Sequence, residues 1–154
     1  IAVLVEGSKV DFSKEDVDAA AAMFLARRDY SRKELRGKLL KKECPADLVD
    51  EVLNDYARRG WLDDVRFAEL QAAILARKQW GPVQIQAKLV HHGVERSVAQ
   101  DAVEGLDVVW EAVARERASG RFLKGDEAKA YRHLVQRGFS ATVSRKIAFS
   151  LGDD

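Results

Sequence analysis

A threefold internal repeat constrains the fold of this 154-residue chain more than any other feature of its sequence. The three copies are anchored on Leu39, Leu89 and Leu134, which are spaced by 50 and then 45 residues. Apolar residues recur four residues before each anchor and five, nine and thirteen residues after it. These positions are Leu35, Ile85 and Ala130; Cys44, Val94 and Phe139; Leu48, Val98 and Val143; and Val52, Ala102 and Ile147. Self-similarity of this period is typical of stacked helical repeats.

Helix boundaries recur together with the apolar positions. Each copy has a helix-start position eight residues before its anchor and a position four residues after the anchor where a left-handed residue would end the helix. The start positions hold Ser31, Gly81 and Asp126, and the end positions hold Glu43, Gly93 and Gly138. Only 2 Pro and 10 Gly interrupt a composition that otherwise favours helices.

Each repeat is therefore predicted to hold a long first helix, a short second helix, a tight turn and a third helix. The predicted helices span residues 16–28, 32–43 and 46–59; then 63–79, 82–92 and 96–104; then 107–119, 127–137 and 141–151. We expect an all-α protein, an elongated and curved array of three tandem three-helix repeats of helix-turn-helix type. The predicted divisions are an N-terminal tail or non-native remnant at 1–12 and repeats at 13–61, 62–106 and 107–154.

The cysteine count and the hydropathy of the chain limit where it acts. The single cysteine, Cys44, cannot form an internal disulfide and suits a reducing compartment. The N-terminal apolar run at 1–5 is too short for a signal peptide or a membrane span. These features predict a cytoplasmic protein without a membrane partner.

The net charge of +1 conceals a strong segregation of charge along the chain. Residues 27–42 carry 8 basic and 2 acidic side chains (+6), residues 43–64 carry 2 basic and 7 acidic (−5), and residues 115–146 carry 9 basic and 3 acidic (+6). We predict two partner-binding or DNA-binding surfaces. Basic surface 1 comprises Arg27, Arg28, Arg32, Lys33, Arg36, Lys38, Lys41 and Lys42, and basic surface 2 comprises Arg115, Arg121, Lys129, Arg132, Arg137, Arg145 and Lys146.

Two interpretations of these basic surfaces stand beside each other. Most charge runs are only solvated faces, but such surfaces also bind DNA phosphates or acidic protein surfaces. Because Arg28, Arg32 and Arg36 are spaced four apart, a tight turn at 29–31 would align them in one row. An acidic band next to a basic one favours a protein partner, since DNA would repel the acidic side chains.

The sequence contains no catalytic constellation, so no enzyme activity, cofactor or metal site is predicted. Adjacent His91 and His92 would point about 100° apart on a helix and could not comfortably share one metal. His133 is expected at the surface, and Cys44 is expected to be a small core residue. Asp63 and Asp64 are interpreted as helix-capping residues.

Helix-turn-helix DNA binding is the main alternative based on the residues alone. The second repeat has the required spacing, but its third helix region holds Glu95, Arg96, Asp101 and Glu104, a net charge of −2. A recognition helix of that charge fits the major groove poorly. Arg145 and Lys146 leave weak DNA contact open in the last repeat.

Several of these segments together resemble the RecX family. The stretch at 26–39 (ARRDYSRKELRGKL) is similar to the opening motif of that family, and 60–68 (GWLDDVRFA) is similar to its second motif. A third, looser motif is matched by Gly81-Pro82 with Ile85, Leu89 and Gly93-Val94, and Gly138-Phe139 fits the last repeat. The resemblance covers about residues 17–151. Lys88 and His92 depart from it, standing where the family usually has an acid and a lysine.

The resemblance implies a bacterial, non-enzymatic modulator of the RecA recombinase in homologous recombination, DNA repair and the SOS response. Such a protein binds the groove of the RecA–DNA filament, mostly as an inhibitor of ATP hydrolysis, strand exchange and filament growth. The implied partner is the RecA filament, with DNA bound weakly or through the filament, and the chain is expected to be a monomer. The alternatives left open are a repeat module that binds bare DNA directly and a helical scaffold of another type.

Overall fold

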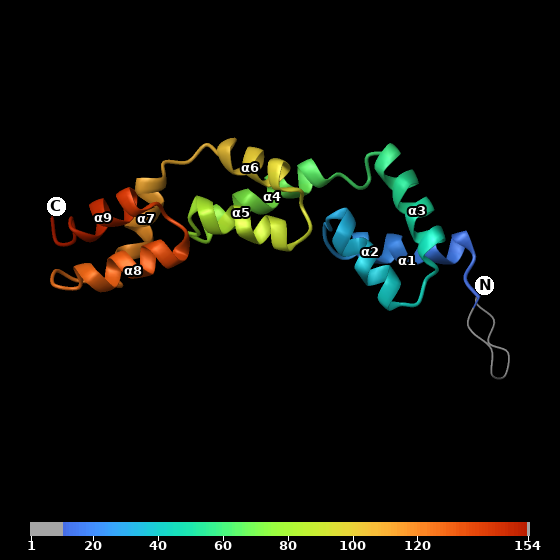
Figure 1. Ribbon diagram of the computed structural model, residues 1–154, viewed down its shortest axis with the longest axis horizontal. Helices are drawn as coiled ribbons and strands as arrows, with labels where there is room; N and C mark the ends of the chain where they lie inside the picture. Colours follow the sequence, from blue (N-terminus) through green and yellow to red (C-terminus); the bar gives the residue numbers. More distant parts are fainter. Residues whose placement is uncertain (1–10, 154) are drawn as a thin grey trace. The chain divides into compact units, whose positions relative to one another are not determined.

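The computed structural model describes residues 11–153, and these residues form nine α-helices and no strand (Figure 1). The helices are α1 (Lys14–Arg27), α2 (Arg32–Lys41), α3 (Ala46–Arg58), α4 (Asp64–Arg77), α5 (Pro82–His91), α6 (Arg96–Glu104), α7 (Trp110–Ala118), α8 (Glu127–Arg137) and α9 (Ala141–Ala148). Every predicted helix is present, with ends that differ by at most three residues. The predicted all-α repeat architecture is confirmed, whereas its elongation and curvature stay predictions.

Helices α1 and α2 begin where side chains satisfy free backbone N–H groups. Ser13 accepts a hydrogen bond from the Asp16 N–H, and the Asp16 carboxylate accepts one from the Ser13 N–H. Ser31 and Glu34 form the same reciprocal capping box at the start of α2. Each box satisfies two donors that a bare helix end would leave unpaired.

A residue with positive φ follows within two positions of the end of the second helix of every repeat. The angles are +67° at Glu43, +97° at Gly93 and +105° at Gly138, so the predicted left-handed ends are confirmed. A non-glycine residue pays a steric cost in this conformation, and Glu43 therefore shows that the turn geometry is maintained even without glycine.

The anchors of the repeat are the most deeply buried side chains. Leu39, Leu89 and Leu134 are fully buried, as are the residues four positions before them. The positions thirteen residues after the anchors are also buried, whereas those nine residues after are only partly buried. Apolar spacing in the sequence therefore identified the inner face of the second and third helices.

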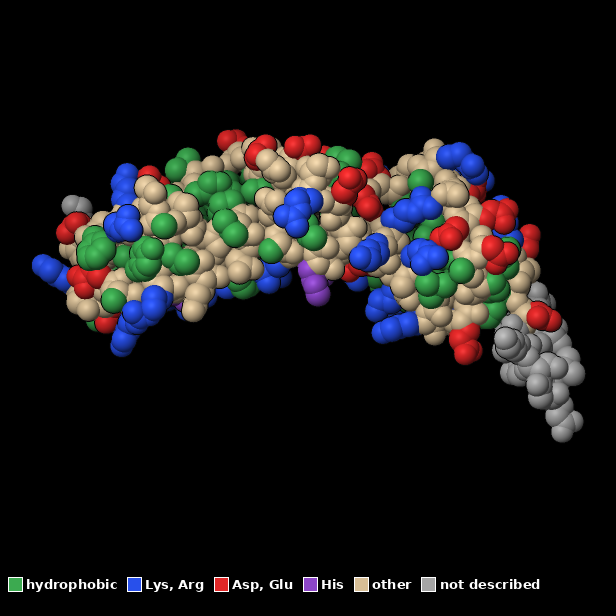
Figure 2. All heavy atoms as spheres, viewed as in Figure 1, with side chains coloured by type: hydrophobic (Ala, Val, Ile, Leu, Met, Phe, Trp, Pro, Cys, Tyr) green, Lys and Arg blue, Asp and Glu red, His purple; other side chains and the backbone are tan. Residues whose placement is uncertain are grey.

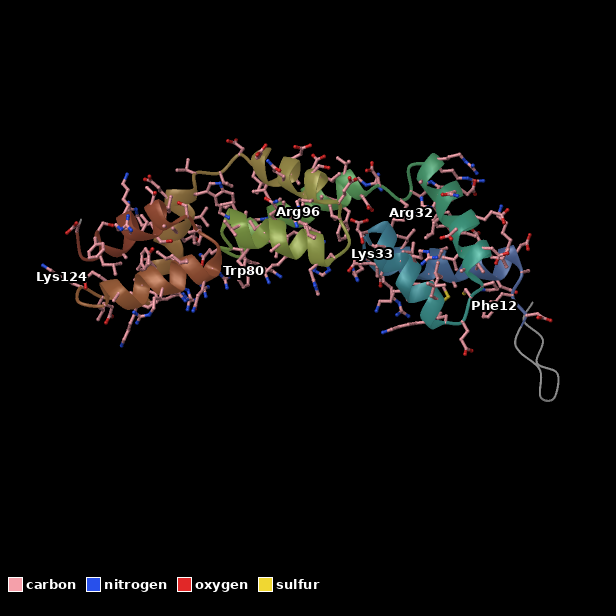
Figure 3. The ribbon with its side chains drawn as sticks, in the orientation of Figure 1. Phe12, Arg32, Lys33, Trp80, Arg96 and Lys124 are labelled. Atoms are coloured by element: carbon pink, nitrogen blue, oxygen red, sulfur yellow. The ribbon has the colours of Figure 1, made fainter. Side chains whose placement is uncertain are left out.

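Contacts divide the chain into two units, of which unit 1 comprises Ile1–Phe67 together with His92–Val94. Its core includes Val17, Leu35, Val49, Leu53 and Tyr56, contributed by α1, α2 and α3. Phe12, labelled in Figure 3, packs against this core. The other residues of the predicted tail, apart from Asp11, lie outside the described part of the chain.

Unit 2 comprises Ala68–His91 and Glu95–Asp154. Its last three helices enclose a core that includes Ala114, Leu134, Phe139 and Ile147. Within the described residues, no helix of either unit has the length and apolar character needed to cross a membrane.

Candidate partner-binding surfaces

Basic surface 1 lies on the end of α1 and along α2, as predicted from the sequence. Figure 2 shows Lys and Arg side chains gathered over the part of unit 1 that carries α2. Six of its eight members are exposed, while Arg32 and Arg36 are partly buried. The members differ in whether their charged groups form hydrogen bonds or ion pairs within the protein.

Arg32 and Arg36 are tied to α3. The Arg36 Nε donates a 2.8 Å hydrogen bond to the Asp50 carboxylate, and the Arg32 guanidinium donates to the side-chain oxygen of Asn54. The hydrogen bond from Arg36 holds the pKa of Asp50 below its usual range. These two arginines therefore join α2 to α3 within the first repeat, and Asp50 partly neutralises the charge of Arg36.

Arg28 points to a different set of partners. Its backbone is extended, its guanidinium lies 3.7 Å from the centre of the Tyr30 ring, and it donates a 2.9 Å hydrogen bond to the Asp29 carbonyl. The four-residue spacing therefore does not continue from α1 into α2. The predicted row of Arg28, Arg32 and Arg36 is wrong, because the segment between the helices is not a tight helical turn.

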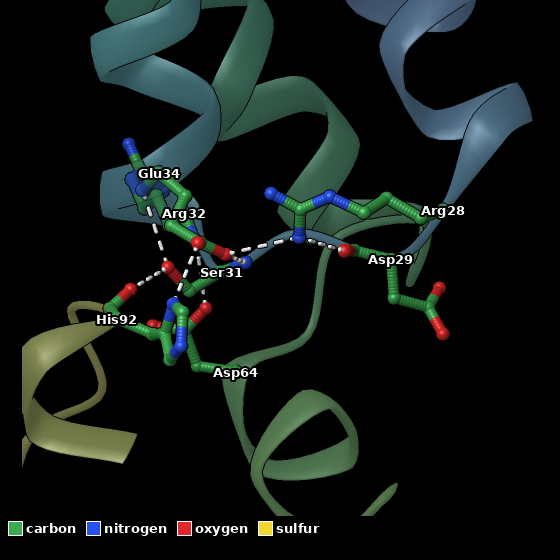
Figure 4. Close-up of polar contacts among 7 residues, drawn as sticks. All are labelled: Arg28, Asp29, Ser31, Arg32, Glu34, Asp64 and His92. Atoms are coloured by element: carbon green, nitrogen blue, oxygen red, sulfur yellow. Dashed lines mark hydrogen bonds and ion pairs between the residues drawn. The ribbon is translucent and has the colours of Figure 1, made fainter. Parts of the chain in front are cut away.

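A polar network surrounds the start of α2 (Figure 4). The Ser31 hydroxyl donates a hydrogen bond to the His92 carbonyl, and a Glu34 carboxylate oxygen lies 2.9 Å from the His92 Nδ1. The Arg32 N–H donates a 2.8 Å hydrogen bond to the Asp64 carboxylate. Asp64 therefore caps α2, a role that the sequence did not indicate. Asp63 caps α4 as predicted, by accepting from the backbone N–H groups of residues 65 and 66.

The Glu34 carboxylate is the centre of this network. Burial alone would raise its pKa, but hydrogen bonds from His92, the Ser31 N–H and Arg28 outweigh that effect. The pKa of Glu34 is therefore lowered, and the carboxylate stays ionised at neutral pH. Glu34 belongs to the framework that holds basic surface 1 in place.

The remaining cations of basic surface 1 are exposed to solvent. Lys33, Lys38 and Lys41 are exposed, and within residues 11–153 they form no ion pair. Arg27 and Lys42 line a groove of about 250 Å³ whose apolar wall includes Met23 and Phe24. Basic surface 1 thus combines unpaired positive charge with a small apolar recess.

Basic surface 2 lies in unit 2, on α7, α8, α9 and the segment between α7 and α8. All its members except Arg137 are exposed. Lys146 forms a 3.0 Å ion pair with Glu111, and Arg115 donates a hydrogen bond to the Ser150 hydroxyl. Within the described residues, Arg121, Lys129 and Arg132 form no ion pair.

Arg137 is held by the protein on several sides. Its guanidinium donates hydrogen bonds to the carbonyls of Lys78 and Gln79 and lies 3.5 Å from the centre of the Trp80 ring. The Lys88 ammonium lies 4.0 Å from the same ring, which is labelled in Figure 3. These contacts use the donors of Arg137 to join α8 to the end of α4. Its predicted role in partner binding stays a prediction.

His133 is not the open surface residue that the sequence predicted. It is partly buried, its ring stacks at a tilt on Phe122, and it accepts a 3.0 Å hydrogen bond from the Arg117 Nε. Burial, reinforced by the charges of Arg117, Arg121 and Arg137, lowers the pKa of His133. The imidazole is therefore neutral at pH 7 and acts as an acceptor.

Two aromatic residues beside basic surface 2 were not singled out from the sequence. Tyr131 lies under Arg145, with 5.9 Å from the guanidinium carbon to the ring centre, and Phe149 is 67% exposed at the end of α9. Aligning the repeats could have identified Phe149, because Asn54 and Glu104 are polar at the corresponding positions. Among the described residues, no three His, Cys, Asp or Glu side chains are grouped to hold a metal ion.

Comparisons with known proteins concern most of the chain. Residues 19–55 match the family model for the RecX first three-helix domain, and residues 63–103 match that for the second. The chain is 35% identical over 153 residues to Regulatory protein RecX of Halorhodospira halophila, covering 96% of this chain and 95% of the relative. It is 33% identical over 136 residues to that of Escherichia coli O7:K1, covering 77% and 81%.

Solved structures show the same fold. RecX from Lactobacillus salivarius superimposes with a TM-score of 0.76 at 22% identity, covering 90% of this chain and 96% of that one. A second solved regulatory protein RecX superimposes with a TM-score of 0.71 at 21% identity, covering 87% and 72%.

Proposed function

The chain belongs to the RecX family of regulatory proteins, and on that premise we propose that it regulates the RecA recombinase by binding the RecA–DNA filament. In this proposal it suppresses ATP hydrolysis, strand exchange and filament growth. It acts by binding, without chemistry of its own, in the cytoplasm, as part of homologous recombination, DNA repair and the SOS response. The protein is proposed to act as a monomer that contacts DNA weakly or through the filament.

The observation that carries the proposal is the division of each basic surface into anchored and available cations. Arg32, Arg36 and Arg137 hold helices together, whereas Lys33, Lys38 and Lys41 present unpaired charge to solvent. Unpaired charge on a rigid helix supports recognition of an acidic partner, because little has to rearrange on binding. The acidic helix α3 beside basic surface 1 favours a protein–DNA filament over DNA alone.

We propose repeat boundaries at 13–61, 62–106 and 107–154, so that basic surface 1 lies in the first repeat and basic surface 2 in the last. A filament offers the same subunit surface many times. Two modest contacts made by one chain can then reinforce each other, since the second forms at a high effective concentration. This accounts for regulation by a small protein without any one strong binding pocket.

The test is the concentration of this protein that halves DNA-dependent ATP hydrolysis by RecA. A variant with Lys33→Gln, Lys38→Gln and Lys41→Gln should require about tenfold more protein, since each lost surface contact costs about 0.5 kcal/mol. The matched control carries Arg66→Gln, Arg77→Gln and Arg96→Gln, which remove the same charge from exposed positions outside both basic surfaces. Equal inhibition by the two variants would remove basic surface 1 from the proposal.

A further inference from the structure

The three repeats differ in how they close one face, between the second and third helices. In the first repeat polar pairs bridge this face, because Arg36 is bonded to Asp50 and Arg32 is bonded to Asn54. The corresponding residues of the second repeat are Pro82, Gln86, Gln100 and Glu104, and those of the third are Glu127, Tyr131, Arg145 and Phe149. The third repeat thus replaces the two polar pairs with two aromatic residues, an arginine and a glutamate.

This replacement coincides with a wider opening. The face between α8 and α9 holds a groove of about 700 Å³, lined among others by Tyr131, Arg132, Arg145 and Phe149. The equivalent face between α5 and α6 holds a groove of about 420 Å³ whose lining includes Gln86, Gln100 and Glu104. Of these two faces, the one between α8 and α9 therefore combines an aromatic wall with the larger recess.

Phe149 is a large apolar side chain that is exposed at this face. It is 67% exposed, although the same position holds polar Asn54 and Glu104 in the other repeats. An exposed phenylalanine forgoes the favourable burial of a large apolar side chain. Figure 2 shows hydrophobic side chains at the surface of the part of unit 2 that carries α7, α8 and α9. Aromatic residues in such recesses are typical anchoring points of protein interfaces.

The charges around the groove indicate what could fill it. Arg132 and Arg145 are exposed, and within the described residues neither forms an ion pair. Their planar guanidinium groups suit bidentate binding of carboxylates or phosphates. Glu127 also lines the groove, so the net charge of these three side chains is +1.

We propose that the α8–α9 groove is a docking site for an acidic protein segment of the recombinase that carries an apolar anchor residue. The anchor would contact Tyr131 and Phe149, and acidic side chains beside it would pair with Arg132 and Arg145. This inference rests on the proposed function, since it takes RecA to be the partner. A peptide is favoured over nucleic acid because the Glu127 carboxylate repels a phosphate backbone that is charged at every residue, whereas a peptide backbone is neutral and its N–H groups can donate to Glu127.

The test uses residues that the other repeats already carry at these positions. Phe149→Asn copies Asn54, and Arg145→Gln copies Gln100, so both variants should fold. Leu123→Asn is the matched control, because Leu123 is 73% exposed in the same unit but does not line the groove. Binding of each full-length variant is measured on RecA–single-stranded DNA filaments and on the same DNA without RecA.

The expected result is filament binding about tenfold weaker for Phe149→Asn, several-fold weaker for Arg145→Gln, and unchanged for Leu123→Asn. Binding to bare DNA should change less than twofold. Wild-type filament affinity retained by both groove variants would overturn the docking site and leave the proposed function standing. An equal loss on bare DNA would overturn it by assigning the groove to nucleic acid. No filament binding by the wild-type chain would overturn both proposals.

Discussion

Gly81 and Gly138 lie in direct backbone contact, so that a methyl group on Gly81 would overlap the carbonyl group of Gly138. The Gly81 N–H donates a 2.9 Å hydrogen bond to the Arg137 carbonyl, and the Val83 N–H donates one of 3.0 Å to the Gly138 carbonyl. The end of α8 thus supplies acceptors for the start of α5, which lacks a capping side chain at Gly81. The close approach depends on the absence of a side chain at both glycines.

Substitution of Gly81 by alanine should therefore destabilise the protein strongly. Because backbone atoms rather than a flexible side chain occupy the space, the two segments would have to separate. We expect a loss of about 3 kcal/mol in the free energy of unfolding, measured by urea denaturation. Gly37→Ala is the control, since nothing lies near its Cβ position within α2. It should stabilise the protein by about 0.5–1 kcal/mol through helix propensity, and equal effects of both substitutions would contradict the contact.

Ser31 has two structural roles, and Ser13, which has only one of them, serves as the comparison. Both Ser13 and Ser31 cap a helix in a reciprocal box, but only Ser31 also donates a hydrogen bond to the His92 carbonyl. Ser13→Ala should cost about 1 kcal/mol as a lost cap. Ser31→Ala should cost about 1 kcal/mol more, because it also removes the hydrogen bond to the His92 carbonyl. Equal unfolding free energies for the two variants would show that the His92 contact adds no stability.

Arg137 should behave as a structural residue when it is replaced. Arg137→Gln removes hydrogen bonds to two carbonyls and the contact with the Trp80 ring. We expect a loss of about 2 kcal/mol, since charge-assisted hydrogen bonds contribute more than neutral ones. Lys129→Gln, on the exposed side of the same helix, should change stability by less than about 0.5 kcal/mol. Thermal and urea unfolding measure the free energy of unfolding of both variants. Equal losses for the two would contradict a structural role of Arg137.

His133 should make the stability of the protein sensitive to mildly acidic pH. Its pKa in the folded protein lies below the value of about 6.5 that it regains on unfolding. As the pH falls below about 6.5, the unfolded chain binds a proton more readily, and the folded state loses stability. His133→Gln keeps an acceptor for Arg117 but does not titrate. Between about pH 7.5 and about pH 5.5, the variant should lose less unfolding free energy than the wild type. Equal losses for the two proteins would contradict His133 as the source of the pH dependence.

The helices could be predicted from the sequence because their signals are local and repeated. Apolar spacing around Leu39, Leu89 and Leu134 indicated which face is buried, and all three side chains are fully buried. The left-handed end at Glu43 followed from its alignment with two glycines. Such features need only the chain itself and the steric preferences of the backbone.

The division of the basic surfaces could not be predicted in the same way. Whether an arginine is anchored or available depends on partners distant in sequence, such as Asp50 for Arg36 and the Gln79 carbonyl for Arg137. Counting charges treats all these cations as equivalent. The row of arginines was wrong for the same reason, because the extended backbone at Arg28 breaks the helical spacing.

The most direct measurement of the central claim compares binding of this protein to RecA–single-stranded DNA filaments and to the same DNA alone. It should be made at about 0.15 M salt, where interactions between surface charges are partly screened. Repeating it over a salt series then gives the salt dependence of each affinity. We predict clear preference for the filament at that salt concentration, with a shallower salt dependence than for bare DNA. Equal affinity for both, falling with the same steep slope, would contradict a regulator that recognises the recombinase and would favour a DNA-binding module instead.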